Sequence, residues 1–242
     1  MSAAAAATRG TPAVPAPGSA PGSARDRARL PGIYLVTDPA LCGDRGVAAT
    51  VRAAVDGGVR TVQIREKHAS AADFYALVLE VAAQVGDRAD ILVDDRVDIY
   101  LAARAAGAAV HGVHVGQSDL PAEAVRALVG PDAVVGLTAN TPAHLDALRR
   151  LPSGTVDYLG AGVIRPTSTK PDHPEPLGIA GFAQFAAAAP LPCVAIGGVR
   201  AEDIGPLRAA GAAGVAVVSA ICAAADPRAA AEALGEEWRN EG

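Results

Sequence analysis

The sequence predicts an α/β fold in which eight β–α units close into a single (β/α)8 barrel, the TIM-barrel architecture. Short runs rich in Val, Ile and Leu alternate with Ala-rich stretches that suit helices. The apolar runs are continuous rather than alternating, as expected of parallel strands that are covered on both faces. Eight such units in roughly 210 residues match the size of a compact barrel.

Each expected strand ends in polar or glycine residues and is followed by an expected helix. The strands are 32–38, 61–67, 90–95, 112–116, 134–139, 158–163, 192–198 and 214–221. The helices are 47–56, 71–85, 97–106, 121–129, 142–150, 179–188, 201–210 and 226–238.

Signals at the ends of these helices support the arrangement. Pro121 and Pro142 stand where a first helical turn tolerates proline, and Thr141 could cap the second of these helices. Glycines suited to a left-handed helix end precede three of the strands: Gly58, Gly107 and Gly211. An open, doubly wound sheet would also alternate strands and helices. Its GxGxxG pattern is absent after the first strand, which continues as TDPALCGDRG, so the number of units favours the barrel.

Residues 1–30 differ in composition from the rest of the chain. They are mainly Ala, Pro, Gly and Ser, without the apolar stretch of a secretory signal. The prolines prevent a long helix, and the side chains offer little to bury. We therefore expect a disordered extension at 1–30 and one catalytic barrel domain at 31–242.

Composition and charge exclude several classes of protein. A formal net charge of −5 and an aromatic content of 3% argue against a nucleic-acid partner. No apolar run approaches the roughly 20 residues that cross a membrane. The cysteines form no CxxC pair, which predicts reduced, structural thiols in a cytoplasmic protein: Cys42, Cys193 and Cys222. The sequence leaves open whether the chain forms a homo-oligomer.

Polar side chains alternate at the end of the second expected strand. Gln63, Arg65 and Lys67 stand at i, i+2 and i+4, so they share one face. One charge alone would indicate only a solvated strand end. Three polar residues favour a site at which the arginine and the lysine hold phosphate oxygens. Active sites of such barrels lie at these strand ends.

Carboxylates follow the third and fourth expected strands. Asp94 and Asp95 end one strand, and Asp119 lies just beyond the next. Magnesium prefers a few carboxylates together with phosphate oxygens and waters. Either Asp95 or Asp119 alone could simply cap the following helix. Beside a basic strand end, the pair favours a site for one Mg2+ ion.

A long loop and two later strand ends complete the expected rim. The loop 162–178 contains four prolines that stiffen it, which argues against a merely flexible connection. Its hydroxyl and ammonium groups can bind a diphosphate: Thr167, Ser168, Thr169 and Lys170. The runs IGGV (196–199) and VVSAI (217–221) stand where such barrels bind phosphate through backbone N–H groups.

The histidines predict no metal or nucleophilic site. His111 and His114 flank the fourth strand without the spacing of metal ligands. The others are expected at the surface: His68, His144 and His173. No Ser–His–Asp or Cys–His arrangement follows from the sequence.

Six motifs in order resemble the thiamine phosphate synthase family over essentially the whole expected domain. They are VQIREK, DDRVD, HVGQSDLP, DYLGAGVIRPTSTKP, AIGGV and VVSAI. The resemblance implies a transferase of thiamine biosynthesis with a magnesium-dependent (β/α)8 barrel. Family members join hydroxymethylpyrimidine diphosphate to thiazole phosphate, which forms thiamine phosphate and releases pyrophosphate.

The family pattern also implies site residues. Those for the pyrimidine diphosphate are Gln63, Ile64, Arg65, Glu66, Lys67, Asp94, Thr138, Thr167, Ser168, Thr169 and Lys170. Those for the thiazole phosphate are Gly198, Val218 and Ser219, and the magnesium ligands are Asp95 and Asp119. The residues implied in catalysis are Arg65, Lys67, Thr138 and Lys170.

This chain departs from the family pattern at three places. The family often has asparagine at Asp94 and serine at Thr138, and the segment Val163–Arg165 is more polar than usual. None of these differences removes a charge that the chemistry needs.

The resemblance implies a dissociative reaction. A diphosphate leaves readily only when its charge is neutralised, which Mg2+ with Arg65, Lys67 and Lys170 can do. A thiazole phosphate tautomerase of the same fold is one alternative, and a non-catalytic phosphate-ligand sensor is another. Neither needs the full basic and magnesium-binding equipment, so we expect a synthase that acts on two small molecules.

Overall fold

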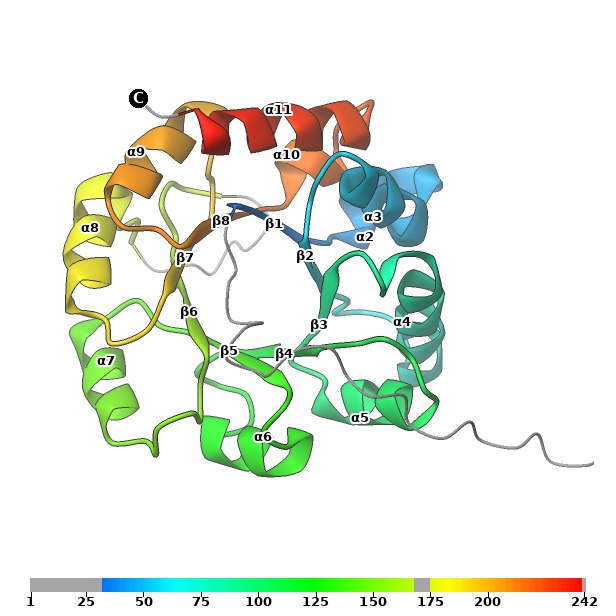
Figure 1. The fold of residues 1–242 in the computed structure, drawn as a ribbon, viewed down its shortest axis with the longest axis horizontal. Coiled ribbons are helices and arrows are strands. Elements are labelled where there is room, and N and C mark those ends of the chain that lie inside the picture. Colours follow the sequence, from blue (N-terminus) through cyan, green and yellow to red (C-terminus); the bar gives the residue numbers. More distant parts are fainter. Residues whose placement is uncertain (1–31, 168–174, 241–242) are drawn as a thin grey trace, which may run out of the picture.

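The computed structural model describes residues 32–167 and 175–240, which form a closed barrel of eight parallel strands. Figure 1 shows the strands in chain order around the centre, with the helices outside them. Strand β1 pairs with β8 as well as with β2, so the ring closes. The predicted (β/α)8 fold is confirmed. The expected extension at 1–30 lies outside the described residues, as do Ser168, Thr169 and Lys170.

All eight strands are shorter than the sequence runs predicted. They are β1 Gly32–Val36, β2 Thr61–Ile64, β3 Asp90–Asp94, β4 Gly112–Val115, β5 Val134–Thr138, β6 Tyr158–Gly162, β7 Cys193–Ile196 and β8 Gly214–Val217. The largest difference is at 214–221, where the ladder stops at Val217 and the short helix α10 (Ser219–Cys222) follows. A short apolar run does not by itself distinguish a strand from a buried helical turn.

The main helices begin and end within one residue of the predicted positions. They are α3 Val47–Asp56, α4 Ala71–Val85, α5 Val97–Ala105, α6 Ala122–Val129, α7 Pro142–Arg149, α8 Gly178–Ala188 and α11 Pro227–Arg239. The expected helix 201–210 divides into the 3-10 turn η2 (Ala201–Asp203) and α9 (Ile204–Ala209). Two short elements after β1 were not predicted: α2 (Pro39–Cys42) and η1 (Gly43–Arg45).

Most of the predicted end signals are present. The Thr141 hydroxyl accepts a hydrogen bond from the backbone N–H of His144 and so caps α7. Positive φ angles of 102°, 81° and 90° occur at Gly58, Gly107 and Gly211. Pro121 is extended, with a ψ of 137°, and therefore stands one residue ahead of α6 rather than inside it.

Apolar side chains fill two layers of core. The larger layer lies between the strands and the helices and contains Leu35, Ile64 and Phe182. The smaller layer lies inside the barrel and consists of Tyr34, Val36, Leu92, Val134, Tyr158, Val194 and Ala216. Successive strand residues point to opposite faces, which places Tyr34 inside and Leu35 outside.

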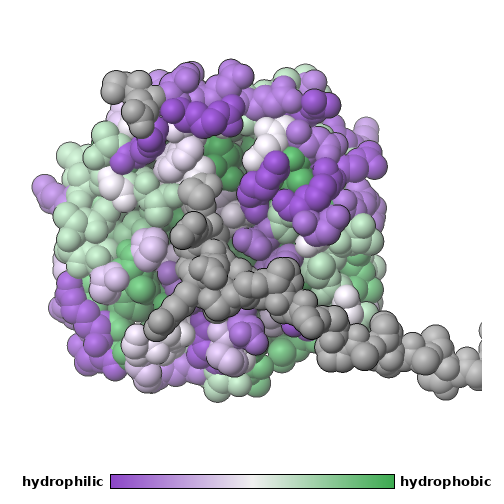
Figure 2. Space-filling view, in the orientation of Figure 1, coloured by the Kyte–Doolittle hydropathy of each residue, from purple (hydrophilic) through white to green (hydrophobic). Residues whose placement is uncertain are grey.

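The outer surface differs between helices. Figure 2 shows hydrophilic residues over α11 and paler, more hydrophobic surface over α8. Exposed residues of α11 include Glu232 and Glu236, whereas α8 exposes Ala180 and Ala187. No helix within 32–167 and 175–240 is long and apolar enough to cross a membrane.

Candidate active site

The carboxyl ends of β2 and β3 bring basic and acidic side chains together. Lys67 Nζ lies 2.9 Å from Asp94 Oδ2 and also contacts the Asp95 carboxylate. Arg65 Nε lies 3.9 Å from Asp94 Oδ2, and Arg65 Nη1 lies 3.8 Å from Asp38 Oδ2. Arg65 and Lys67 thus converge on one carboxylate, although the β2 ladder ends at Ile64. We call these five charged residues the ion-pair cluster.

Asp94 is the most buried carboxylate of the ion-pair cluster, with 8% of its surface exposed. Burial raises the pKa of Asp94, and the neighbouring Lys67 and Arg65 act against this rise. Burial lowers the pKa of Lys67, but Asp94 and Asp95 more than reverse this effect, so the net shift is upward. The carboxylates therefore hold the lysine in its charged form at the rim.

The other residues of the QIREK run point elsewhere. Gln63 is buried, and its Nε2 donates to Tyr34 OH at 2.9 Å inside the barrel. The side chain of Ile64 is fully buried in the outer core and does not reach the rim. Glu66 Oε1 accepts hydrogen bonds from the backbone of its own loop, at His68 N (2.7 Å) and Ala69 N (3.1 Å).

Asp95 and Asp119 interact across the ends of β3 and β4. Asp95 has a φ of 57°, a left-handed conformation that is costly for a residue with a side chain and clusters at functional sites. Asp119 Oδ2 accepts a hydrogen bond from Gly116 N at 2.7 Å. Burial raises the pKa of Asp119, and the Asp95 carboxylate raises it further. Neither aspartate caps a helix, because α5 follows Arg96 and α6 follows Pro121.

The donor set of Asp95 and Asp119 fits a magnesium ion. The Asp95 carboxylate contributes to the raised pKa of Asp119, and a divalent cation between the two groups would relieve this repulsion. Among residues 32–167 and 175–240, no group of three or more His, Cys, Asp or Glu could hold a metal. Magnesium does not require one, because it retains waters and takes phosphate oxygens as ligands.

A chain of hydrogen bonds inside the barrel was missed by the sequence analysis. Tyr158 OH lies 2.9 Å from Tyr34 OH and 2.8 Å from His114 Nδ1. His114 Nε2 lies 3.0 Å from Thr138 Oγ1, at the end of β5. Burial lowers the pKa of His114 to about 4, so its imidazole is neutral at physiological pH.

The alternation of residues along the strand GVHV could have predicted that His114 points into the barrel. Val113 and Val115 face the outer core, so His114 between them faces the barrel interior. A polar ring directed into a barrel needs a hydrogen-bond partner there. The residues that supply it come from other strands, and a single-sequence pattern does not identify them.

The loops after β6 and β7 are joined by an ion pair. Arg165 Nε and Nη2 donate to the two carboxylate oxygens of Asp203 at 2.9 and 2.5 Å. Asp203 is buried, and Arg165 lowers the pKa of its carboxyl group. Asp203 Oδ2 also accepts a hydrogen bond from Arg200 N at 3.0 Å. Arg165 lies in the segment that is more polar than the family pattern, and in this chain Asp203 is its partner.

The expected phosphate-binding segments adjoin these loops. Gly198 has a φ of 67°, and a Cβ there would lie 2.8 Å from the carbonyl oxygen of Arg165, so the position requires glycine. Val218 precedes the four-residue helix α10, and Ser219 is its exposed first residue. Thr167 is partly exposed and is the last described residue before 175.

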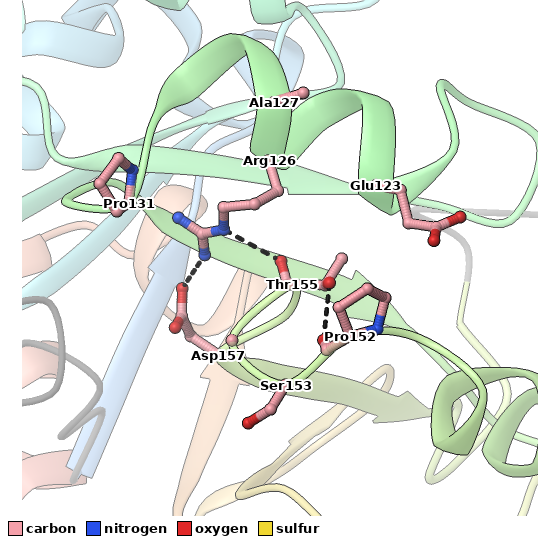
Figure 3. Close-up of a pocket in the computed structure, with 9 residues that line it drawn as sticks. Glu123, Arg126, Ala127, Pro131, Pro152, Ser153, Thr155 and Asp157 are labelled. Carbon is pink, nitrogen blue, oxygen red and sulfur yellow. Dashed lines mark hydrogen bonds and ion pairs between the residues drawn. The ribbon is translucent and has the colours of Figure 1, made fainter.

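A cavity of about 530 Å³ lies away from these strand ends (Figure 3). Arg126 spans it, with Nη2 donating to Asp157 Oδ2 at 2.7 Å and Nε donating to the carbonyl oxygen of Thr155 at 3.2 Å. Its Nη1 donates to the carbonyl oxygens of Gly130 and Ala133. The arginine thus supports the segments that lead into β5 and β6.

Comparisons with known proteins agree on one family. A family model described as thiamine monophosphate synthase matches residues 33–221. A thiamine-phosphate synthase of Corynebacterium efficiens is 48% identical, over 75% of this chain and 83% of the relative. A thiamine-phosphate synthase of Psychrobacter sp. is 43% identical, over 84% of this chain and 92% of the relative.

A solved structure agrees with this result. A thiamine phosphate pyrophosphorylase from Pyrococcus furiosus superposes with a TM-score of 0.73 and 29% identity, covering 87% of this chain and 96% of that one. An orotidine 5'-phosphate decarboxylase from Pyrococcus horikoshii superposes with a TM-score of 0.57 and 15% identity, covering 86% of this chain and all of that one (100%). At such low identity the second likeness shows the barrel fold alone.

Proposed function

Because the chain belongs to the thiamine monophosphate synthase family, we propose that it joins hydroxymethylpyrimidine diphosphate to thiazole phosphate. The products are thiamine phosphate and pyrophosphate, so the enzyme is a transferase. The observation that carries the proposal is the convergence of Arg65 and Lys67 on Asp94, beside Asp95. A leaving diphosphate needs fixed positive charge of this kind.

We assign the diphosphate to the ion-pair cluster. Arg65 offers paired donors to its oxygens, and Lys67 offers a point charge. When the diphosphate binds, Arg65 and Lys67 exchange contacts with Asp94 and Asp95 for contacts with its oxygens. The family pattern alone supports the same assignment for four further residues: Thr167, Ser168, Thr169 and Lys170.

We assign the magnesium site to Asp95 and Asp119, and the rise that the Asp95 carboxylate causes in the pKa of Asp119 supports the assignment. The ion, when bound, supplies Lewis-acid neutralisation of the diphosphate. The left-handed backbone of Asp95 and the hydrogen bond from Gly116 to Asp119 preorganise the two carboxylates. Two carboxylate ligands suit a single Mg2+ ion, so we propose one ion in each active site.

The reaction exchanges one bond at the pyrimidine methylene carbon. The carbon–oxygen bond breaks, and the diphosphate departs with the electron pair. The thiazole ring nitrogen then supplies the pair that forms the new carbon–nitrogen bond. Neither change requires a protein base, so the side chains mainly position reactants and neutralise charge. We assign the phosphate of the thiazole to Gly198, Val218 and Ser219.

The ion-pair cluster distinguishes this reaction from two other functions. A thiazole phosphate tautomerase moves a proton and releases no diphosphate. A phosphate-ligand sensor binds without turnover and gains nothing from a clamp on a leaving group. Arg65 and Lys67 beside a carboxylate pair favour the synthase.

Incubation of the purified chain with both substrates and Mg2+ tests the proposal. Thiamine phosphate and pyrophosphate should form in equal amounts, and omission of either substrate should abolish both. Arg65→Ala should lower turnover about a hundredfold. Arg88→Ala, which removes an exposed ion pair with Asp56, is the matched control and should leave turnover unchanged. Folded protein that forms no product above background rejects the synthase assignment.

We further infer that the protein works in the cytoplasm. Its cysteines are buried free thiols, of the kind that a reducing compartment preserves: Cys42, Cys193 and Cys222.

A further inference from the structure

The barrel interior contains a continuous line of polar groups that ends at the rim. Gln63 Nε2 contacts Tyr34 OH, Tyr34 OH contacts Tyr158 OH, and Tyr158 OH contacts His114 Nδ1. His114 Nε2 then contacts Thr138 Oγ1. Tyr34 and Tyr158 are almost completely buried, so each of their hydroxyl hydrogens needs an acceptor within the protein. We call these five residues the barrel relay.

The amide of Gln63 sets the direction of the barrel relay. Its Nε2 can only donate, so Tyr34 OH accepts there and directs its own hydrogen to Tyr158 OH. Tyr158 then donates to His114 Nδ1, which leaves the proton of the neutral ring on Nε2. With the opposite direction, Tyr34 OH would accept twice and its buried hydrogen would have no acceptor in the relay.

The same direction determines what Thr138 can do. His114 Nε2–H donates to Thr138 Oγ1, so the hydroxyl hydrogen of Thr138 is not consumed by the histidine. It can be donated to a ligand at the strand end. Gln117 Nε2 holds the same residue from the loop after β4, by donating to the Thr138 carbonyl oxygen at 2.6 Å.

Two glycines provide the space that the barrel relay occupies. A Cβ on Gly136 would lie 2.2 Å from Tyr158 Cζ and 2.4 Å from His114 Nδ1. A Cβ on Gly160 would lie 3.1 Å from His114 Cε1. Neither glycine has a positive φ, so room for the rings, rather than backbone freedom, explains both.

We propose that His114 and Tyr158 are positioning residues, which fix the Thr138 hydroxyl as a hydrogen-bond donor toward the pyrimidine diphosphate. The inference rests on the proposed function for the identity of this ligand. The direction of the relay rests on the hydrogen bonds of this chain.

Tyr158→Phe tests the proposal because it removes one oxygen and keeps the ring. The His114 tautomer is then no longer imposed, and the Thr138 hydroxyl can turn toward Nε2. We expect kcat to fall about tenfold, the effect of one lost hydrogen bond, with little change in either KM. Tyr34→Phe, one link further from the rim, should have a smaller effect.

A double-mutant cycle separates positioning from general damage. Thr138→Ala should lower kcat about a hundredfold, and Thr138→Ser should retain most activity. If the relay acts through the hydroxyl, Tyr158→Phe should cause no further loss in the Thr138→Ala background. Losses that multiply would overturn the proposal.

Thr155→Val is the matched control for the loss of a buried hydroxyl. Thr155 Oγ1 donates to the Pro152 carbonyl oxygen at 2.7 Å, ahead of β6 (Figure 3). This variant should lose stability but keep kcat. An equal fall in kcat for Thr155→Val and Tyr158→Phe would show that the latter reports stability alone, and would overturn the proposal.

The tautomer of His114 gives a readout that needs no turnover. Nitrogen NMR at neutral pH should show His114 protonated on Nε2, and a mixture of tautomers in Tyr158→Phe. Protonation on Nδ1 in the unaltered protein would overturn the proposal even if thiamine phosphate forms. An Nε2 tautomer in a protein that makes no product would count against the proposed function instead.

Discussion

Lys67 Nζ lies 2.9 Å from Oδ2 of Asp94, a carboxylate that is nearly buried. A lysine on a flexible four-carbon stem would otherwise sample many positions. The buried partner holds its charge at the mouth of the barrel before any ligand arrives. An anion that binds there replaces one carboxylate contact and does not have to order the lysine.

Lys67→Met should lower turnover about a hundredfold, because the leaving diphosphate loses one of its cations. It should also lower thermal stability, since Asp94 keeps only the more distant Arg65. Adding Asp94→Asn should restore stability but not turnover, as no buried carboxylate is then left unpaired. Pyrophosphate release and thermal unfolding measure the two effects. Full turnover in Lys67→Met would remove this lysine from the mechanism.

Asp119→Asn should raise the Mg2+ concentration that gives half-maximal rate by about tenfold or more, because a neutral amide replaces a charged ligand. Titration of the rate with Mg2+ measures the shift. Asp146→Asn alters an exposed aspartate that pairs with Arg149 on α7, and it should behave as the unaltered protein does. The same Mg2+ dependence in Asp119→Asn would argue against its role as a ligand.

Acidification should destabilise the protein through His114. Burial lowers the pKa of His114 from 6.5 to about 4. Between these values the unfolded chain binds a proton that the folded protein does not, so stability falls as the pH falls. Over this pH range the lowered pKa of His114 should reduce the free energy of unfolding by about 3 kcal/mol. His114→Gln should flatten this part of the pH profile in urea unfolding, and an unchanged profile would contradict the prediction.

Gly136→Ala should destabilise the protein by about 1–3 kcal/mol, because its Cβ would overlap the Tyr158 ring. Gly160→Ala is the matched comparison, since its closest contact would be 3.1 Å rather than 2.2 Å. Chemical denaturation should therefore rank Gly160→Ala as the milder change. Equal stability of the two variants would mean that the rings can move aside.

Periodicity was sufficient to predict the barrel and its main helices, although not the short elements α2 and η1 after β1. Strand ends were harder to predict. The run 214–221 is uniformly apolar, yet the chain leaves the ladder after Val217 to form α10. Whether a hydrophobic residue continues a strand depends on the length of its partner strand, which a local pattern does not contain.

The candidate site was predictable where charge stands out against an apolar strand, as at Arg65, Lys67 and Asp94. The relay was not, because Tyr34 and Tyr158 are distant in sequence and resemble ordinary core aromatics. Arg165 was visible as a polar departure, but its partner Asp203 lies in another unit. Side-chain contacts between different β–α units depend on how the barrel closes, which a local sequence pattern does not contain.

Asp203 accepts hydrogen bonds from both Arg165 and Arg200, which has a consequence for local motion. Opening the Arg165 loop alone would deprive the buried Asp203 carboxylate of its arginine, and opening the Asp203 loop alone would leave Arg165 without its carboxylate. The two loops should therefore open together as one cooperative unit. Amide hydrogen exchange would then report a shared opening free energy for the segments around Arg165 and Gly198. The coupling joins the segment that leads into the long loop to the one assigned to the thiazole phosphate.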